Sequence, residues 1–98
     1  MLVGAVHGQV LHLANLTIVE DSIDYLDAAF TFSPDWEGLS KWAHFQKGET
    51  IYDVALVEDR IERKQHLNLD QGTWEVYLHG SREDIRITTS TVRLRVLD

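Results

Sequence analysis

The chain has 98 residues, no cysteine, and 16 acidic against nine basic side chains, which gives a formal net charge of −7. This length fits one domain, and the absence of cysteine excludes disulfides, thiolate catalysis and cysteine-based zinc sites. The acidic balance disfavours nucleic acid and anionic membrane surfaces as partners, because both carry negative charge. We therefore expect a single domain over residues 1–98, either alone or as one segment of a longer chain.

No segment predicts a membrane span or a secretory leader. No apolar run approaches the roughly 20 residues that a bilayer-spanning helix needs. The N-terminus also lacks a basic region followed by a long apolar stretch. We expect a protein that is made in the cytoplasm and stays there unless a larger particle carries it out.

Alternation of apolar and polar residues dominates the chain, with turn residues about every 8 to 12 positions, which is typical of antiparallel β-sheets. In residues 10–19 the apolar positions change parity near Asn15, which predicts a bulge or bend there. Asp21 and Ser22 then predict a tight turn.

Residues 23–33 form the clearest strand of the sequence. Its core-facing side chains are expected to be Leu26, Ala28, Phe30 and Phe32. Proline cannot donate to a sheet ladder, so residues 33–35 (SPD) end the strand. Trp36 and Leu39 are expected to pack in the loop that follows.

Two strands joined by a turn at residues 47–49 predict a β-hairpin. The first covers residues 41–46 and buries Ala43 and Phe45. The second covers residues 50–57 and places three apolar side chains on one side, namely Tyr52, Val54 and Leu56.

The last third of the chain begins with the densely charged residues 58–65, which predict a loop or a short irregular strand. Leu67 and Leu69 then return to the core before a turn at residues 70–72. Residues 73–79 and 91–97 predict strands, and a turn at residues 80–84 lies between them. The inward side chains of this part are expected to be Trp74, Val76, Leu78, Ile85, Ile87, Val92, Leu94 and Val96.

Seven or eight short strands of this kind predict an all-β protein, specifically an immunoglobulin-like antiparallel β-sandwich. A small closed β-barrel is the alternative architecture.

Three segments resemble a known family. They are residues 25–38 (YLDAAFTFSPDWEG), residues 43–56 (AHFQKGETIYDVAL), and residues 72–96, which contain GTWEVYLHG and RITTSTVRLRV. Together they resemble the small immunoglobulin-like domains of tail, baseplate and head-associated proteins from bacteriophages and prophages of Gram-positive bacteria. The chain departs from the family pattern at Trp42 and in the charged residues 59–64.

The resemblance implies a virion building block that is made in the bacterial cytoplasm and ends up in the assembled particle. Its partners would be other virion proteins, further copies of itself, or carbohydrate of the host surface. The resemblance supplies no catalytic residues, and its motifs concern packing and turns.

Catalysis, metals and cofactors find little support in the residues themselves. The five histidines lack the spacing of a zinc site, which needs three or four converging ligands. Serine, histidine and aspartate are present without a nucleophile-elbow pattern. We therefore expect no enzymatic activity and no cofactor.

Trp42, His44 and Tyr77 are the candidate contact residues for a partner. If Ala43 and Phe45 face the core, Trp42 and His44 face outward, where an exposed tryptophan suits a partner protein or a sugar ring. The alternative is that a neighbouring loop covers Trp42. Tyr77 joins the same patch only if its strand shares a sheet with that of Trp42.

The first functional hypothesis is a non-enzymatic structural or interaction module of a phage or prophage virion. It would mediate assembly or space a part that contacts the receptor. The second is a carbohydrate-binding module for host attachment, which would show a row of exposed aromatic side chains with polar neighbours. The third is a cell-surface adhesion domain.

Overall fold

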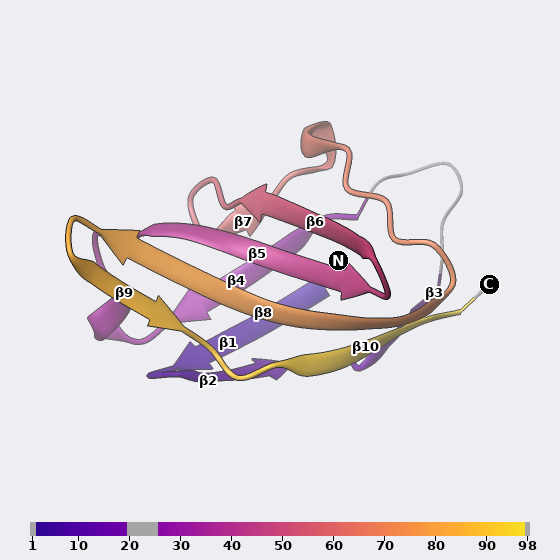
Figure 1. Cartoon of the computed structure of the whole chain (residues 1–98), viewed down its shortest axis with the longest axis horizontal. Helices are drawn as coiled ribbons and strands as arrows, with labels where there is room; N and C mark the ends of the chain where they lie inside the picture. The colour runs from indigo at the N-terminus through magenta and orange to yellow at the C-terminus, as the bar shows by residue number, and fades with distance from the viewer. Residues whose placement is uncertain (1, 20–25, 98) are drawn as a thin grey trace.

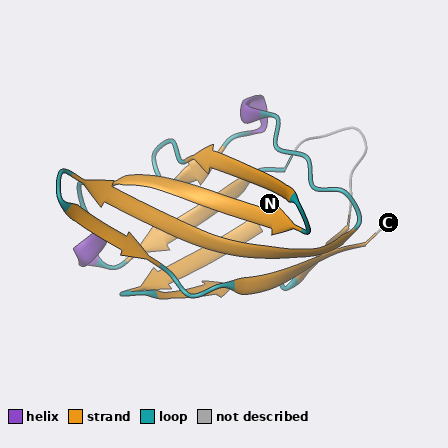
Figure 2. Ribbon diagram, in the orientation of Figure 1, coloured by secondary structure: helices purple, strands orange, loops and turns teal. Residues whose placement is uncertain are grey.

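The structure is a computed structural model that describes residues 2–19 and 26–97. In this part of the chain the strands form two sheets, and no α-helix is present. Figure 1 shows the two layers, with the strands of the rear sheet crossing those of the front sheet obliquely. Two short 3₁₀ turns, η1 (Pro34–Trp36) and η2 (Arg63–Gln65), lie in the loops (Figure 2).

The smaller sheet contains, in spatial order, β2 (Val10–Leu13), β1 (Leu2–His7), β4 (Ala28–Phe32) and β7 (Arg60–Ile61). β1 pairs antiparallel with β2 and parallel with β4. No strand was expected before Val10. The N-terminal residues nevertheless build the centre of this sheet, where Leu2 and Val6 are buried.

The larger sheet contains, in spatial order, β3 (Thr17–Val19), β10 (Val92–Leu97), β8 (Gly72–Arg82), β5 (Ser40–Lys47) and β6 (Thr50–Ala55). β9 (Ile85–Thr88) also pairs with β8. β3 runs parallel to β10, and the other pairs are antiparallel.

The all-β class is confirmed, and three details of the expected fold differ in the structure. The sheets are mixed rather than antiparallel, because β1 and β3 each lie beside a strand that runs in the same direction. The barrel alternative fails because the described strands form two separate sheets and do not close. The described residues also form ten strands rather than seven or eight, several of them only two to four residues long.

The change of parity near Asn15 lies at a bend in residues 14–16, which is one of the two expected alternatives. The chain leaves the smaller sheet after Leu13 and joins the larger sheet at Thr17. Leu11 therefore faces the core from one sheet, and Ile18 packs against it from the other. The connecting residues 14–16 are not part of a strand, so the period-two pattern is interrupted there and need not keep its parity in the second sheet.

The strand expected over residues 23–33 is shorter in the structure. β4 begins at Ala28, where Ala28 and Phe30 are buried as expected and Phe32 is partly buried. Before it, the Asp27 carbonyl accepts a hydrogen bond from the Leu2 amide in an irregular stretch. The first part of this expected strand and the turn at residues 21–22 lie outside the described residues.

The hairpin expected in the middle of the chain is confirmed as β5 and β6, with Ala43 and Phe45 fully buried. In the charged residues 58–65 the short strand β7 is followed by η2. Leu67 and Leu69 are buried, as expected.

β8 is longer than expected, because it continues through Gly80 to Arg82 and turns at residues 83–84. Ile85 was expected to face inward, but it is 43% exposed. The longer strand moves the turn towards the end of the sheet, so Ile85 lies beyond the core. Ile87 packs against the core, as expected.

A bulge separates β9 from β10. Thr88 pairs with His79 and Val92 pairs with Val76, so residues 89–91 lie opposite only residues 77–78. At this extra residue the Ser90 amide donates to the Gln9 carbonyl at 2.7 Å. The bulge therefore links the larger sheet to the β1–β2 turn of the smaller one.

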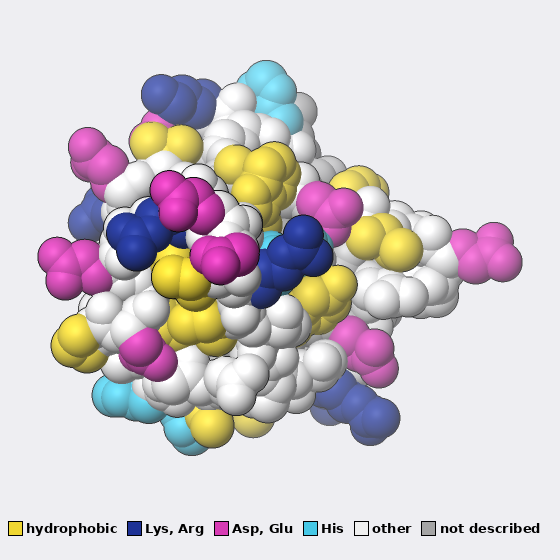
Figure 3. Space-filling view, turned by 60° about the vertical axis from the view of Figure 1, so that its left-hand side comes forward, with side chains coloured by type: hydrophobic (Ala, Val, Ile, Leu, Met, Phe, Trp, Pro, Cys, Tyr) yellow, Lys and Arg dark blue, Asp and Glu magenta, His cyan; other side chains and the backbone are white. Residues whose placement is uncertain are grey.

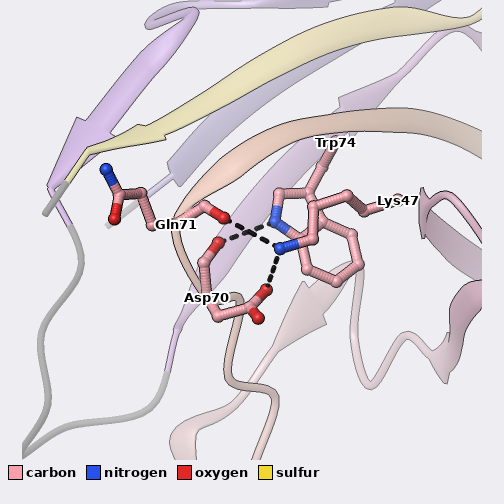
Figure 4. A network of polar contacts seen from close by, with 4 residues as sticks. All are labelled: Lys47, Asp70, Gln71 and Trp74. Atoms are coloured by element: carbon pink, nitrogen blue, oxygen red, sulfur yellow. Dashed lines mark hydrogen bonds and ion pairs between the residues drawn. The ribbon is translucent and has the colours of Figure 1, made fainter.

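A polar network surrounds Trp74 at the start of β8 (Figure 4). The Trp74 side chain is fully buried, and its Nε1 donates to the Asp70 carbonyl at 2.9 Å. The Lys47 ammonium lies over the Trp74 ring and donates to the Asp70 carboxylate and the Gln71 carbonyl. This network ties the β5–β6 turn to the turn before β8.

Candidate functional site

The three candidate contact residues lie on the outer face of the larger sheet. Trp42 and His44 belong to β5, and Tyr77 belongs to the neighbouring strand β8. In the register of these strands His44 lies opposite Tyr77, and Trp42 lies opposite His79. The condition for a single patch, that the two strands share a sheet, is therefore met.

His44, Tyr77 and His79 are in ring contact. The His44 ring stacks on Tyr77 with 4.6 Å between the ring centroids and an interplanar angle of 17°. His79 meets His44 edge-on, with centroids 6.2 Å apart. We call Trp42, His44, Tyr77 and His79 the aromatic cluster.

Polar partners on the two flanking strands hold both imidazole rings of the cluster. Nδ1 of His44 is hydrogen-bonded to the carboxylate of Asp53 on β6. Nδ1 of His79 lies 3.1 Å from Oγ1 of Thr88 on β9. Since Nδ1 of each ring is occupied, Nε2 is the ring nitrogen that remains available for a ligand or partner.

The cluster combines exposure with fixed positions. Trp42 is 40% exposed, whereas His44 and Tyr77 are half-buried by their neighbours. A tryptophan that projects from a rigid sheet presents a large contact area and loses little side-chain entropy on binding. The alternative, that a neighbouring loop covers Trp42, does not hold for the described residues, because this side chain remains exposed.

A hollow of about 340 Å³ lies beside Trp42, between the start of β5 and the end of β6. Its wall includes Ser40 and the acidic residues Glu58 and Asp59. In the space-filling view the exposed hydrophobic side chains form separate patches between charged ones (Figure 3). The surface therefore offers several small apolar contacts, each next to charge.

The turn that carries Glu58 and Asp59 is unusual. Both residues have positive φ, 52° and 63°, while Val57 and Arg60 exchange two backbone hydrogen bonds around them. Such a turn normally takes asparagine and glycine, because other side chains are strained there. Two hydrogen bonds of Asp59 stabilise this strained turn. Its carbonyl accepts one from the Phe30 amide, and its carboxylate accepts one from the Lys41 ammonium at 2.8 Å.

Lys41, which forms the ion pair with Asp59, is largely buried. Its side chain is only 13% exposed, and its ammonium lies 4.7 Å from the centroid of the Phe32 ring. The ion pair of Lys41 and Asp59 lines both the hollow beside Trp42 and a second one, of about 350 Å³, towards Pro34. The pair therefore forms a shared polar wall between two shallow hollows.

Asp53, Glu58, Asp59 and His79 were not among the predicted site residues. Asp53 could have been predicted from the hairpin, because a two-residue turn at Gly48 and Glu49 places Asp53 opposite His44. His79 could be placed beside His44 only once β5 and β8 were known to be neighbouring strands. Glu58 and Asp59 carried no signal, since two consecutive acidic residues do not predict a turn of this kind.

The groups assembled here can form ring-stacking contacts, hydrogen bonds and ion pairs. In the described residues no group of three or more histidine, aspartate or glutamate side chains could hold a metal ion. The same part of the chain has no helix that is long and apolar enough to cross a bilayer.

Comparison with known proteins found no matching family model, no matching curated protein and no matching solved structure. The class that the fold defines is an all-β protein of two mixed sheets. Its function must therefore be argued from the aromatic cluster and the hollow beside it.

Proposed function

We propose that this chain is a non-enzymatic interaction module of a phage or prophage virion. Its outer face on the larger sheet binds another subunit of the particle, with the aromatic cluster at the centre of the contact. The protein is made in the bacterial cytoplasm and reaches the virion by assembly.

The observation that carries this proposal is the exposed Trp42 beside the ring cluster on β5 and β8. Tryptophan and tyrosine are enriched among the few interface residues that supply most of the binding energy. The Asp53 and Thr88 contacts fix the two imidazole rings, so little conformational freedom is lost on binding.

The strand order supports an immunoglobulin-like fold as the finer assignment. β10, β8, β5 and β6 lie side by side in the order G, F, C and C′ of variable-type immunoglobulin domains. β4 beside β7 corresponds to strands B and E. The parallel pair of β1 and β4 departs from that fold, because β1 is inserted between β2 and β4.

The virion assignment rests on the three resembling segments. They correspond to β4 with η1, to the β5–β6 hairpin, and to β8 with β9 and β10. Two of these segments carry three members of the aromatic cluster, and the fourth member, Trp42, is a point where the chain departs from the family pattern. A residue specific to this chain is a reasonable place for a contact specific to its own particle.

The test is co-elution with proteins encoded beside this gene. Each neighbouring protein is produced together with the chain and analysed by size-exclusion chromatography. We expect one of them to co-elute with the wild type, and Trp42→Ala to weaken this complex about tenfold or more. Ile85→Ala serves as the control, since it removes another exposed apolar side chain of the same sheet. The proposal fails if no neighbouring protein co-elutes, or if Trp42→Ala binds as tightly as the control.

A carbohydrate-binding function is the second candidate, and the hollow beside Trp42 favours it. An exposed indole ring next to the carboxylates of Glu58 and Asp59 combines an apolar platform with hydrogen-bond acceptors for hydroxyl groups. Titration with oligosaccharides from the host cell wall, followed by tryptophan fluorescence, tests it. Saturable quenching that is lost in Trp42→Ala supports sugar binding, and unchanged fluorescence with every sugar excludes it.

A further inference from the structure

β6 forms one edge of the larger sheet, with β5 on one side only. It has six residues, whereas the other end strands of the two sheets, β2, β3 and β7, have four or fewer. Natural proteins usually keep edge strands short or protect them, because an open edge can pair with another chain. β6 is therefore the strand most available for such pairing.

The ladder shows which backbone groups of β6 are open. The Leu56 amide donates to the Lys41 carbonyl, so every second residue from Leu56 back to Thr50 bonds to β5. The N–H and C=O groups of Ile51 and Asp53 therefore face away from β5. The Ala55 carbonyl, which faces the same way, accepts a hydrogen bond from the Gln65 side chain. Within the described residues no group pairs with the backbone of Ile51 or Asp53.

The open stretch has little of the usual protection: its one charged side chain, Asp53, is paired with His44 of the neighbouring strand β5. β6 contains no lysine, no proline and no bulge, and its register with β5 is continuous. Ile51 is 55% exposed on the outer face, and Tyr52 is 40% exposed on the inner face, where it stacks on Trp74. An edge with free backbone groups and exposed apolar side chains on both faces is suited to accept a further strand.

We propose that β6 pairs with β6 of a second copy of this chain. The two strands run antiparallel around a twofold axis at Tyr52, so that the larger sheets of both copies become one continuous sheet. Ile51 then exchanges backbone hydrogen bonds with Asp53 of the second copy, and the two Tyr52 side chains lie next to each other.

This register follows from the charges on the strand. Moving the axis to Asp53 places the two Asp53 carboxylates opposite each other, and moving it to Ile51 places Glu49 opposite Asp53. Like charges directly opposite are unfavourable in a β-ladder, whereas an aromatic pair is favourable. With the axis at Tyr52, each acidic residue faces an apolar one: Asp53 faces Ile51, and Glu49 faces Ala55.

The net charge makes this association sensitive to salt. Each copy carries a formal charge of −7, so two copies repel each other at low ionic strength. Salt screens this repulsion, while backbone hydrogen bonds and apolar contacts persist. We expect the dimer to strengthen as salt is added, whereas a complex held by opposite charges would weaken.

The experiment is sedimentation equilibrium of the full chain from micromolar to millimolar concentration, at low and at physiological salt. We expect the wild-type mass to rise towards twice the monomer mass, and to rise at lower protein concentration when salt is present. Ile51→Glu places a carboxylate opposite Asp53 of the second copy and should remain monomeric, because like charges directly opposite are unfavourable in a β-ladder. Ile85→Glu is the matched control, because it makes the same change at an exposed isoleucine on β9, and it should behave like the wild type.

Ile51→Pro provides a second variant that tests the backbone directly. It removes an N–H group that makes no bond to β5, so the monomer keeps its ladder while the dimer loses a donor on each side. A wild type that stays monomeric throughout, or an Ile51→Glu variant that dimerises like the control, overturns the proposal. Trp42→Ala should dimerise normally, because Trp42 is not on this edge. Dimerisation and binding of another subunit can therefore fail independently.

Discussion

Gly80 and Trp36 show how closely single residues determine the packing of this protein. The Trp36 side chain is fully buried, and its Nε1 donates to the Gly8 carbonyl at 2.7 Å. A Cβ atom on Gly80 would lie only 2.7 Å from Cζ3 of the Trp36 ring. The indole ring can therefore approach β8 this closely only because position 80 has no side chain.

Gly80→Ala should destabilise the fold by about 1–3 kcal/mol, because Trp36 must shift within a close-packed core. Urea unfolding monitored by circular dichroism measures the change. Ser81→Ala, at the next position of the same strand, is the control and should change stability by less than about 0.5 kcal/mol. Equal stability of the two variants would mean that Trp36 relaxes at no cost.

At the scale of the element, the bulge between β9 and β10 depends on Thr89. This residue is buried, and its Oγ1 accepts a hydrogen bond from the Leu78 amide at 2.9 Å and donates one to the Ser90 carbonyl. A side chain thus replaces the backbone acceptor that the bulge removes from the ladder.

Thr89→Val keeps the shape of the side chain but leaves the Leu78 amide without its acceptor. We expect a loss of about 1–3 kcal/mol in the free energy of unfolding, the typical cost of a buried unsatisfied donor. Hydrogen exchange at the Leu78 amide should also become faster. Thr91→Val changes an exposed threonine of the same segment and should have little effect on either measurement. Slow exchange at Leu78 in Thr89→Val would show that another group accepts this bond.

On the scale of the whole molecule, the two sheets share one core. Buried side chains from both sheets form a single cluster that includes Leu2 and Phe30 from one sheet and Phe45 and Leu94 from the other. The hydrogen bond from the Ser90 amide to the Gln9 carbonyl joins the sheets at their margin. Neither sheet can lose its partner without exposing its inner face to water.

Unfolding should therefore be a single cooperative transition. Tryptophan fluorescence reports mainly on η1 and the start of β8, which lie at opposite ends of the molecule (Figure 1), and far-ultraviolet circular dichroism reports on all strands. The two urea curves should coincide, with the same midpoint and slope. Separate midpoints would show that one sheet unfolds before the other.

Much of the local structure was predictable because alternation with period two assigns each strand residue to a face. The inward positions of β8 and β10 were correct, as for Val76 and Leu94, and the β5–β6 hairpin followed from its turn. The pattern failed where it was weak or interrupted. β1 has a glycine and an alanine among its six residues, and Ile85 follows a turn whose position depends on the length of β8.

The all-β class, most strand positions and the outward direction of Trp42, His44 and Tyr77 could be predicted from the alternation of residues along the chain. The folded structure was needed to show that β1 lies between β2 and β4, that β3 joins the larger sheet, and which strand is left at the edge. It also brought His79 and Asp53 to His44. The physical reason is that side-chain alternation fixes the faces of a strand, whereas the backbone groups that choose its neighbours are the same in every residue. Strand neighbours are set by packing between distant parts of the chain, and that information is not local.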